Sequence, residues 1–210
     1  MGDIMRKILL HFAIKYNGDY YKIYQALKEK EIVNKNEIEN IENKIDCKYI
    51  TIIDKDYPES LKQIANPPFV LFYYGDISLI NKPDKISVIG KRENSNYGKV
   101  MCNKIVSELN NQTIVISGLA KGIDCIAHEC AIKTNKKTIA VLASGIDYVY
   151  PQCNYKLYEL IKTNGLLISE YPNKQMPIKQ SFLIRNRIIA ALSHSIIVIE
   201  ANYKSGTMNT

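Results

Sequence analysis

The chain has 210 residues, of which 46% are hydrophobic, so it can bury a core and is not a disordered protein. Its 28 basic and 21 acidic residues give a net charge of +7, which favours a polyanionic partner such as nucleic acid and does not bear on the fold. No run of apolar residues reaches the roughly 20 needed to cross a membrane, which predicts a soluble protein with no membrane partner.

Residues 1–46 are predicted to form helices, because their apolar residues recur at spacings of three or four. Asn36 is placed to cap the third of these helices. The sequence pattern changes at residues 47–85, where Pro58, Pro67, Pro68 and Pro83 interrupt short apolar runs. This segment is predicted to be a linker with one edge strand near residues 70–74, leading into the main fold.

Residues 86–210 are predicted to form a doubly wound, Rossmann-like α/β domain with a mainly parallel sheet. The chain has short, continuous apolar runs at residues 86–89, 113–116, 138–142, 166–168 and 195–199. Segments of helical length separate them. Continuous apolar strands that alternate with helices are typical of a parallel sheet covered on both faces.

Small residues and cations follow these predicted strands. In such sheets ligands bind at the carboxyl ends of the strands, and small residues there let backbone amides and helix amino termini approach an anion. Any one of these glycines is also explained by a tight turn between strand and helix. The residues in question are Gly90, Lys91 and Arg92; Ser117, Gly118, Ala120, Lys121 and Gly122; Ala143, Ser144 and Gly145; Ser169 and Glu170; and Glu200 with Ser205, Gly206 and Thr207.

Several of these loops together favour a basic crevice for a phosphate backbone. Arg92, Lys121 and the pair Arg185 and Arg187 supply the positive charge, and a guanidinium can bind phosphate or stack on a base. The first strand is not followed by GxGxxG, and GxxxxGK[ST] does not occur in the sequence. Dinucleotide and P-loop nucleotide binding therefore lack their defining motifs, and we expect no cofactor.

The sequence offers few candidates for catalysis or metal binding. Asp124 and His128 lie four residues apart on one helix face, where they form either an acid/base pair or a hydrogen bond that fixes the helix. Glu170 and Glu200 end strands and are candidates to orient Arg185 or Arg187. Cys125, His128 and Cys130 lack a second pair at zinc spacing, so we expect neither a catalytic residue nor a metal site.

The five cysteines are odd in number and irregularly spaced, and no signal peptide precedes them. Secreted proteins that rely on disulfides usually have an even number of cysteines at regular spacing, following a signal peptide. The cysteines therefore predict reduced thiols in a cytoplasmic protein.

Beyond these general features, residues 54–210 resemble the DprA/Smf family of DNA-processing proteins. The resemblance rests on the order and spacing of DKDYPESLKQIANPPFVLFYYGD, SVIGKRENSNYG, SGLAKGIDCIAHECAI, TIAVLASGIDYVYPQCN, LLISEYP and FLIRNRIIAALSHSIIVIEANYKSGT. It implies an extended Rossmann fold that binds single-stranded DNA without catalysis. It also implies roles in natural transformation and recombination, through protection of incoming strands and loading of the RecA recombinase.

The resemblance assigns DNA contacts to three strings. They are Gly90, Lys91 and Arg92, where lysine replaces the family's usual small hydroxyl residue; Ser117, Gly118, Ala120 and Gly122; and Arg185, Asn186 and Arg187. Tyr150 and Asn154 match a further family string, YPxxN, in which the tyrosine is either a base-stacking residue or a buried turn residue.

The resemblance also carries expectations about the two ends of the chain. The helices of residues 1–46 are only weakly similar to the SAM-like domain that often precedes the family fold. The chain stops at Thr210, where family members continue, so it resembles a truncated member in which homodimerisation and the recombinase contact are weakened or lost.

Two alternatives remain open at this stage. The first is a nucleotide-binding or nucleotide-cleaving enzyme of the lysine-decarboxylase-like phosphoribohydrolase group, whose GGxGTxxE loop is partly matched by Ser205, Gly206 and Thr207. The second is a folded but inactive remnant.

Overall fold

The structure is a computed structural model that describes residues 2–202. Three helices and a 3-10 turn come first: α1 (Gly2–Lys15), α2 (Tyr20–Lys28), α3 (Lys35–Glu39) and η1 (Ile41–Lys44). Their predicted helical character is confirmed. The predicted cap of the third helix is wrong, because Asn34 precedes α3 and its side chain accepts a hydrogen bond from the amide of Asn36.

Within residues 2–202 one sheet of seven strands follows, in the order β1-β2-β6-β5-β4-β3-β7. The strands are β1 (Lys48–Thr51), β2 (Val70–Gly75), β3 (Lys85–Gly90), β4 (Ile114–Ser117), β5 (Thr138–Val141), β6 (Leu166–Ser169) and β7 (Ser195–Ile199). β1, β2 and β6 pair antiparallel, and β3, β4, β5, β6 and β7 are parallel. The predicted doubly wound α/β fold is thereby confirmed.

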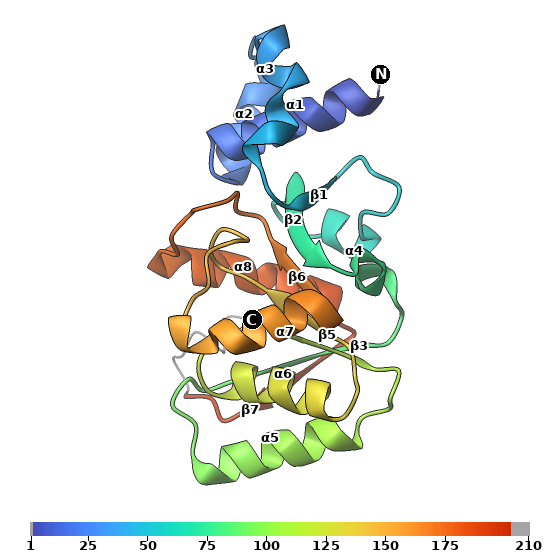
Figure 1. Ribbon diagram of the computed structural model, residues 1–210, viewed down its shortest axis with the longest axis vertical. Helices are drawn as coiled ribbons and strands as arrows, with labels where there is room; N and C mark the ends of the chain where they lie inside the picture. Colours follow the sequence, from blue (N-terminus) through green and yellow to red (C-terminus); the bar gives the residue numbers. More distant parts are fainter. Residues whose placement is uncertain (1, 203–210) are drawn as a thin grey trace.

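Two helices lie mainly on one face of the sheet and three on the other (Figure 1). The first face carries α4 (Glu59–Lys62) and α8 (Lys179–Leu192), and the second α5 (Asn96–Glu108), α6 (Ile123–Lys133) and α7 (Tyr155–Asn164). β5 shows how the sequence separates the faces. Ile139 and Val141 pack with Ile188 of α8, whereas Ala140 packs with Ile161 of α7, because neighbouring strand residues point to opposite faces.

The amino-terminal helices share a core with the sheet rather than standing apart from it. Phe12 and Ile23 are buried in one cluster with Phe72 of β2 and Leu167 of β6. The Tyr20 ring stacks on the ring of Phe69, with 5.2 Å between centroids. Residues 47–85, expected to contribute one strand, supply both β1 and β2 to the sheet.

None of the helices in the described part of the chain is both long and apolar enough to traverse a lipid bilayer.

Candidate functional site

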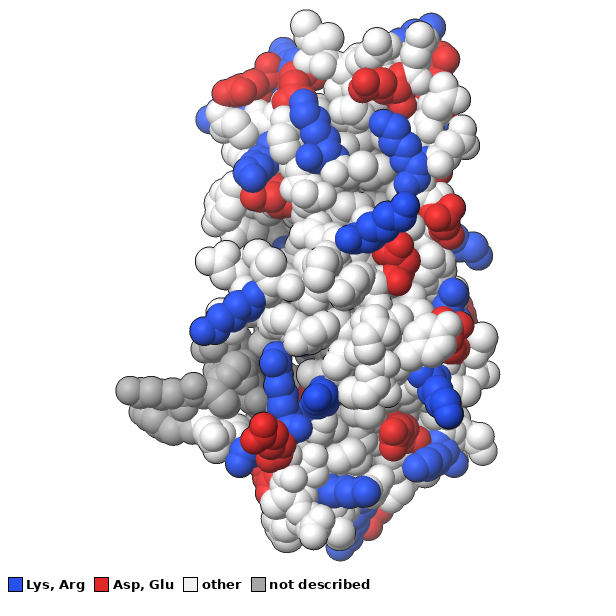
Figure 2. Space-filling model, turned by 60° about the vertical axis from the view of Figure 1, so that its left-hand side comes forward, with Lys and Arg blue, Asp and Glu red and all other residues white. Residues whose placement is uncertain are grey.

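The parallel strands end at one side of the molecule, where helices α5 to α8 begin (Figure 1). Figure 2 turns this side forward and shows Lys and Arg side chains recurring over it, with a group of them in its lower half. The loops that follow β3, β4, β5 and β6 therefore meet at a surface on which Lys and Arg side chains are interspersed with Asp and Glu. This is where the sequence places its candidate residues.

One arginine and two aromatic rings are arranged together at this side. The guanidinium of Arg92, which follows β3, lies 4.9 Å from the ring centroid of Phe182 in the first turn of α8. The ring of Tyr150, from the segment before α7, lies 5.6 Å from the Phe182 ring at an angle of 56°. Arg92 and Tyr150 are exposed and Phe182 is half-buried. We call Arg92, Phe182 and Tyr150 the aromatic platform.

The loop after β4, residues 117–122, is held by bonds from its own helix and from the sheet. The Ser117 hydroxyl donates to the carbonyl of Val88 at 2.7 Å, and the amide of Gly118 donates to the Asp124 carboxylate at 3.2 Å. Lys121 is left exposed at the tip of the loop. The loop is thus held in place by hydrogen bonds and presents the exposed Lys121 side chain.

Gly122 explains how the loops after β3 and β4 come together. Its φ of +79° lies in the region that favours glycine, and an added Cβ would meet the carbonyl oxygens of Lys91 and Arg92. The amide of Ile123 also donates to the Lys91 carbonyl at 3.2 Å. Lys91, Arg92 and Lys121 are therefore carried by two loops in direct contact.

Arg185 lies inside the protein, with 4% of its surface exposed. Its Nη1 donates to the carbonyl oxygens of Gly118, at 2.7 Å, and Val141, at 2.5 Å. Burial lowers the pKa of Arg185 to about 10, and the nearby Asp124 carboxylate opposes that shift. In this arrangement Arg185 supports the loop after β4, and its neighbour Asn186 is also buried.

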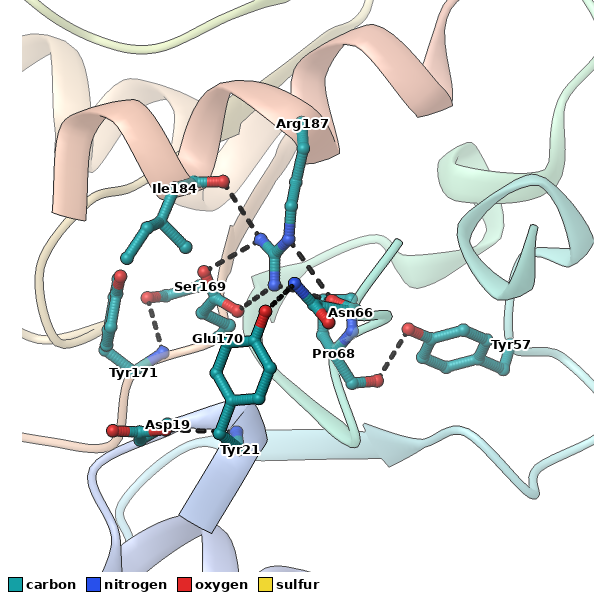
Figure 3. Close-up of polar contacts among 10 residues, drawn as sticks. All are labelled: Asp19, Tyr21, Tyr57, Asn66, Pro68, Ser169, Glu170, Tyr171, Ile184 and Arg187. Atoms are coloured by element: carbon teal, nitrogen blue, oxygen red, sulfur yellow. Dashed lines mark hydrogen bonds and ion pairs between the residues drawn. The ribbon is translucent and has the colours of Figure 1, made fainter. Parts of the chain in front are cut away.

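Arg187 is engaged where the amino-terminal helices meet the sheet (Figure 3). It forms a two-pronged ion pair with Glu170, at 2.6 and 3.0 Å, and the Glu170 side chain is 3% exposed. Arg187 also donates to the backbone carbonyl of Asn66. The side-chain amide of Asn66 in turn donates to the hydroxyl of Tyr21 in α2 at 3.0 Å. Glu170 thus has the orienting role expected for it, as the ion-pair partner of Arg187.

The other titratable candidates have structural partners. The Nδ1 of His128 lies 2.6 Å from the Thr138 hydroxyl, and burial lowers the pKa of His128 to about 3. Asp124 accepts a hydrogen bond from the amide of Gly118 in the loop after β4. Glu200 accepts from the amide of Ser95 at 2.8 Å and holds the residue that caps α5, rather than orienting an arginine.

Asn154 links two of the candidate loops. It is buried just before α7, and its side-chain amide donates to the carbonyl of Leu119 at 3.0 Å. Tyr150 lies four residues before it. A shift of Asn154 would therefore move both the loop after β4 and one ring of the aromatic platform.

The structure divides the predicted site residues into three groups. The exposed or half-buried group is Lys91, Arg92, Ala120, Lys121, Gly122, Tyr150 and Arg187. The buried group is Gly90, Ser117, Gly118, Asn154, Arg185 and Asn186. Ser205, Gly206 and Thr207 lie outside the described residues. Among residues 2–202 there is no group of three His, Cys, Asp or Glu side chains that could hold a metal ion.

Phe182 was not among the residues singled out from the sequence. It lies in the string FLIRNR, one turn of α8 before Arg185. Since residues three apart lie on neighbouring parts of a helix surface, the predicted place of Arg185 at the crevice would also have placed Phe182 beside the same loops. Phe182 carries no charge, and the prediction of the site rested on charged residues.

Comparisons with known proteins agree on one family. The family model described as DNA recombination-mediator protein A matches residues 48–210. DNA processing protein DprA of Streptococcus pneumoniae is 41% identical over 160 residues, covering 76% of this chain and 56% of that protein. DprA of Bacillus subtilis is 40% identical, covering 77% of this chain and 54% of that protein. The chain thus spans about half the length of these relatives.

Solved structures extend the likeness to the fold. The X-ray structure of DNA processing protein A from Streptococcus pneumoniae matches with a TM-score of 0.78 and 34% identity, over 90% of this chain and 63% of that one. DNA processing protein A from Helicobacter pylori, described for its single-stranded DNA binding mode, matches with a TM-score of 0.71 and 37% identity, over 78% and 74%. A match over 90% of the chain includes part of the amino-terminal helices, which the family model does not reach.

Proposed function

Because the chain belongs to the DNA recombination-mediator protein A (DprA/Smf) family, we propose that it binds single-stranded DNA at the carboxyl ends of its parallel strands. The observation that carries the proposal is the aromatic platform, in which Arg92 lies over the ring of Phe182 and Tyr150 lies beside it. A cation next to exposed aromatic surface suits a ligand that has both phosphates and unpaired bases.

The exposed and the buried residues have different roles in binding. Lys91, Arg92 and Lys121 neutralise successive phosphates of one strand, while Phe182 and Tyr150 take bases whose faces are free. Arg185 and Asn154 hold the loop after β4 in place without touching DNA. Duplex DNA buries its base faces by stacking, so it loses the platform contacts and binds more weakly.

The bound strand undergoes no chemistry in this proposal. The carboxylates closest to the loops, Asp124, Glu170 and Glu200, each have structural partners, and burial keeps His128 neutral at physiological pH. Cleavage of a nucleotide needs a free acid or base, so the hydrogen bond by which Glu200 holds Ser95, the cap of α5, speaks against the phosphoribohydrolase alternative. Protection of DNA and delivery to a RecA-type recombinase, in a cytoplasmic setting, extend the same proposal.

The test is a fluorescence anisotropy titration of a labelled oligonucleotide at several salt concentrations, with a duplex of equal length as competitor. We expect affinity that falls steeply with salt and resists the duplex. Arg92→Ala should weaken binding to every sequence and reduce the slope of log affinity against log salt by about one phosphate contact. The control is Lys104→Ala, which removes an equal charge from an exposed position on α5. Equal binding by Arg92→Ala and wild type would contradict the proposed site.

A further inference from the structure

Two cysteines flank the residue that links the candidate loops. The thiol of Cys125, in the first turn of α6, donates to the side-chain oxygen of Asn154 at 3.4 Å. The thiol of Cys153 donates to the same oxygen at 3.6 Å. The distance between the two sulfur atoms therefore cannot exceed the sum of these two distances, although 28 positions separate the two cysteines in the sequence.

We propose that Cys125 and Cys153 form a site of oxidative modification, at which a disulfide bond lowers the affinity of the chain for single-stranded DNA. The effect on DNA rests on the proposed function. The modification itself rests on the shared hydrogen-bond acceptor.

The chemistry needs a two-electron oxidant, and a peroxide is sufficient. The sulfur of Cys153 attacks one peroxide oxygen, the O–O bond breaks, and a sulfenic acid forms while the other oxygen leaves as hydroxide and takes up the thiol proton. The sulfur of Cys125 then attacks the Cys153 sulfur, the S–O bond breaks, and water leaves with the second thiol proton. Two thiols are oxidised to one disulfide, and hydrogen peroxide is reduced to two waters.

The surroundings of the two thiols set the order of these steps. Cys153 is exposed and meets the oxidant first, whereas Cys125 is half-buried. Burial, reinforced by the carboxylate of Glu129, raises the pKa of Cys125 to about 12 and keeps it as the less reactive thiol. Cys125 therefore acts second, once the sulfenic acid lies beside it.

Closing the bond must move at least one of the two thiols away from Asn154. A disulfide brings two sulfurs to about 2.05 Å, well inside the present arrangement in which both point at one oxygen. α6 is packed between α5 and α7, whereas Cys153 lies in the three-residue turn η3 (Gln152–Asn154). The turn is therefore the part that moves. Asn154 then loses both thiol donors, and its bonds to the carbonyls of Leu119 and Ala120 are disturbed.

Oxidation thereby displaces the loop that carries Lys121 and the segment that carries Tyr150. Loss of one or two hydrogen bonds that hold a binding loop corresponds to an affinity decrease of about tenfold. The same decrease should be reversed when dithiothreitol reduces the bond.

The experiment uses the full chain, first reduced and then treated with hydrogen peroxide. Cys125 and Cys153 lie on different tryptic peptides, 122–133 and 138–156, so a non-reducing digest reports the disulfide by mass, and fragmentation distinguishes Cys125 from Cys130. Oligonucleotide affinity is measured before oxidation, after it and after dithiothreitol. Cys153→Ser keeps a hydroxyl donor and should bind as wild type and resist peroxide.

Cys47→Ser is the matched control, because the thiol of Cys47 also donates to an asparagine side chain, Asn173, at 3.4 Å. It should respond to peroxide as wild type does. Absence of the 122–133 to 138–156 crosslink would overturn the proposal, as would an equal loss of affinity in Cys153→Ser. If the reduced chain does not bind DNA, the proposed function fails, and amide hydrogen exchange of residues 117–122 with and without peroxide still decides whether the disulfide moves the loop.

Discussion

At the scale of single residues, the proposed site contains two kinds of DNA contact, one by charge and one by an aromatic ring. Arg92 offers a charge that responds to salt, whereas the ring of Phe182 offers a stacking surface that does not. The two side chains lie against each other, so their effects on affinity can be compared at one place in the molecule. Arginine alone does not mark an exposed cation without partners here, because the side chains of Arg185 and Arg187 are engaged within the protein.

Phe182→Ala should weaken single-strand binding by about 1–3 kcal/mol, the usual contribution of one stacked base, and leave the salt dependence unchanged. Phe182→Tyr keeps the ring and should bind almost as wild type. Anisotropy titrations over a range of salt measure both quantities. A change in the salt slope of Phe182→Ala equal to that of Arg92→Ala would contradict the separation of roles.

His128 gives the fold a dependence on pH. The pKa of an unfolded histidine is about 6.5, and burial lowers that of His128 to about 3, so the unfolded chain binds a proton in this interval that the folded chain does not. The free energy of unfolding should therefore fall as the pH drops from about 6.5 towards 3, by up to about 1.4 kcal/mol per pH unit.

Urea unfolding at a series of pH values measures this loss of stability. His128→Asn retains a donor for the Thr138 hydroxyl and cannot take up the proton, so its curve should be flatter than that of wild type. Parallel curves for the two proteins would show that His128 does not carry the effect.

At the scale of elements, the predicted positions of the parallel strands were close to those observed, and β1 was missed. Strands buried on both faces have continuous apolar runs, and such runs stand out in the sequence. β1 has four residues, Lys48–Thr51, at the edge of the sheet and mixes polar with apolar side chains. Its place depends on pairing with β2, which is tertiary information that a local pattern does not contain.

The candidate site was predictable to a similar degree. The sequence led to the loops after the strands, because their place follows from the topology of a parallel sheet. Which side chain points outward depends on packing instead. α8 shows this, since Phe182 faces Arg92 near the surface while Arg185, one turn later, is buried against the carbonyls of Gly118 and Val141.

The ion pair between Glu170 and Arg187 should govern how α8 is held on the sheet. Glu170→Gln leaves the partly buried Arg187 without its counter-charge and is expected to lower the free energy of unfolding by about 3–5 kcal/mol. Urea denaturation measures the loss. The control is Glu59→Gln at the exposed ion pair with Lys62, which should cost no more than about 1 kcal/mol. Similar losses for the two variants would contradict a special role for the Glu170 pair.

At the scale of the whole molecule, the amino-terminal helices and the sheet are joined by a common core and by polar contacts. Phe12 and Ile23 pack with Phe72, and the Tyr21 hydroxyl is bonded to Asn66, which in turn accepts from Arg187. The division into segments 1–46, 47–85 and 86–210 therefore follows changes in the sequence pattern more closely than it follows the packing of the chain. We propose that the helices act as a degenerate SAM-like unit that has become part of the main fold.

This packing predicts one cooperative unfolding transition. The chain has 15 tyrosines and no tryptophan, so tyrosine emission reports on both parts, while far-ultraviolet circular dichroism follows the helices and the sheet together. The two urea curves should coincide within error. A separate early transition, removed by deleting residues 1–46, would show that the helices fold independently.

The order of strands in the sheet also bears on how the chain folds as it is synthesised. β2 pairs with β6, and β3 pairs with β7, which in each case lies roughly a hundred residues later in the chain. Until the ribosome has released those later strands, β2 and β3 each lack one neighbour that the finished sheet gives them. Closing such long loops is slow, so the nascent chain exposes strand edges until β6 and β7 have been synthesised and should depend on chaperones to avoid aggregation.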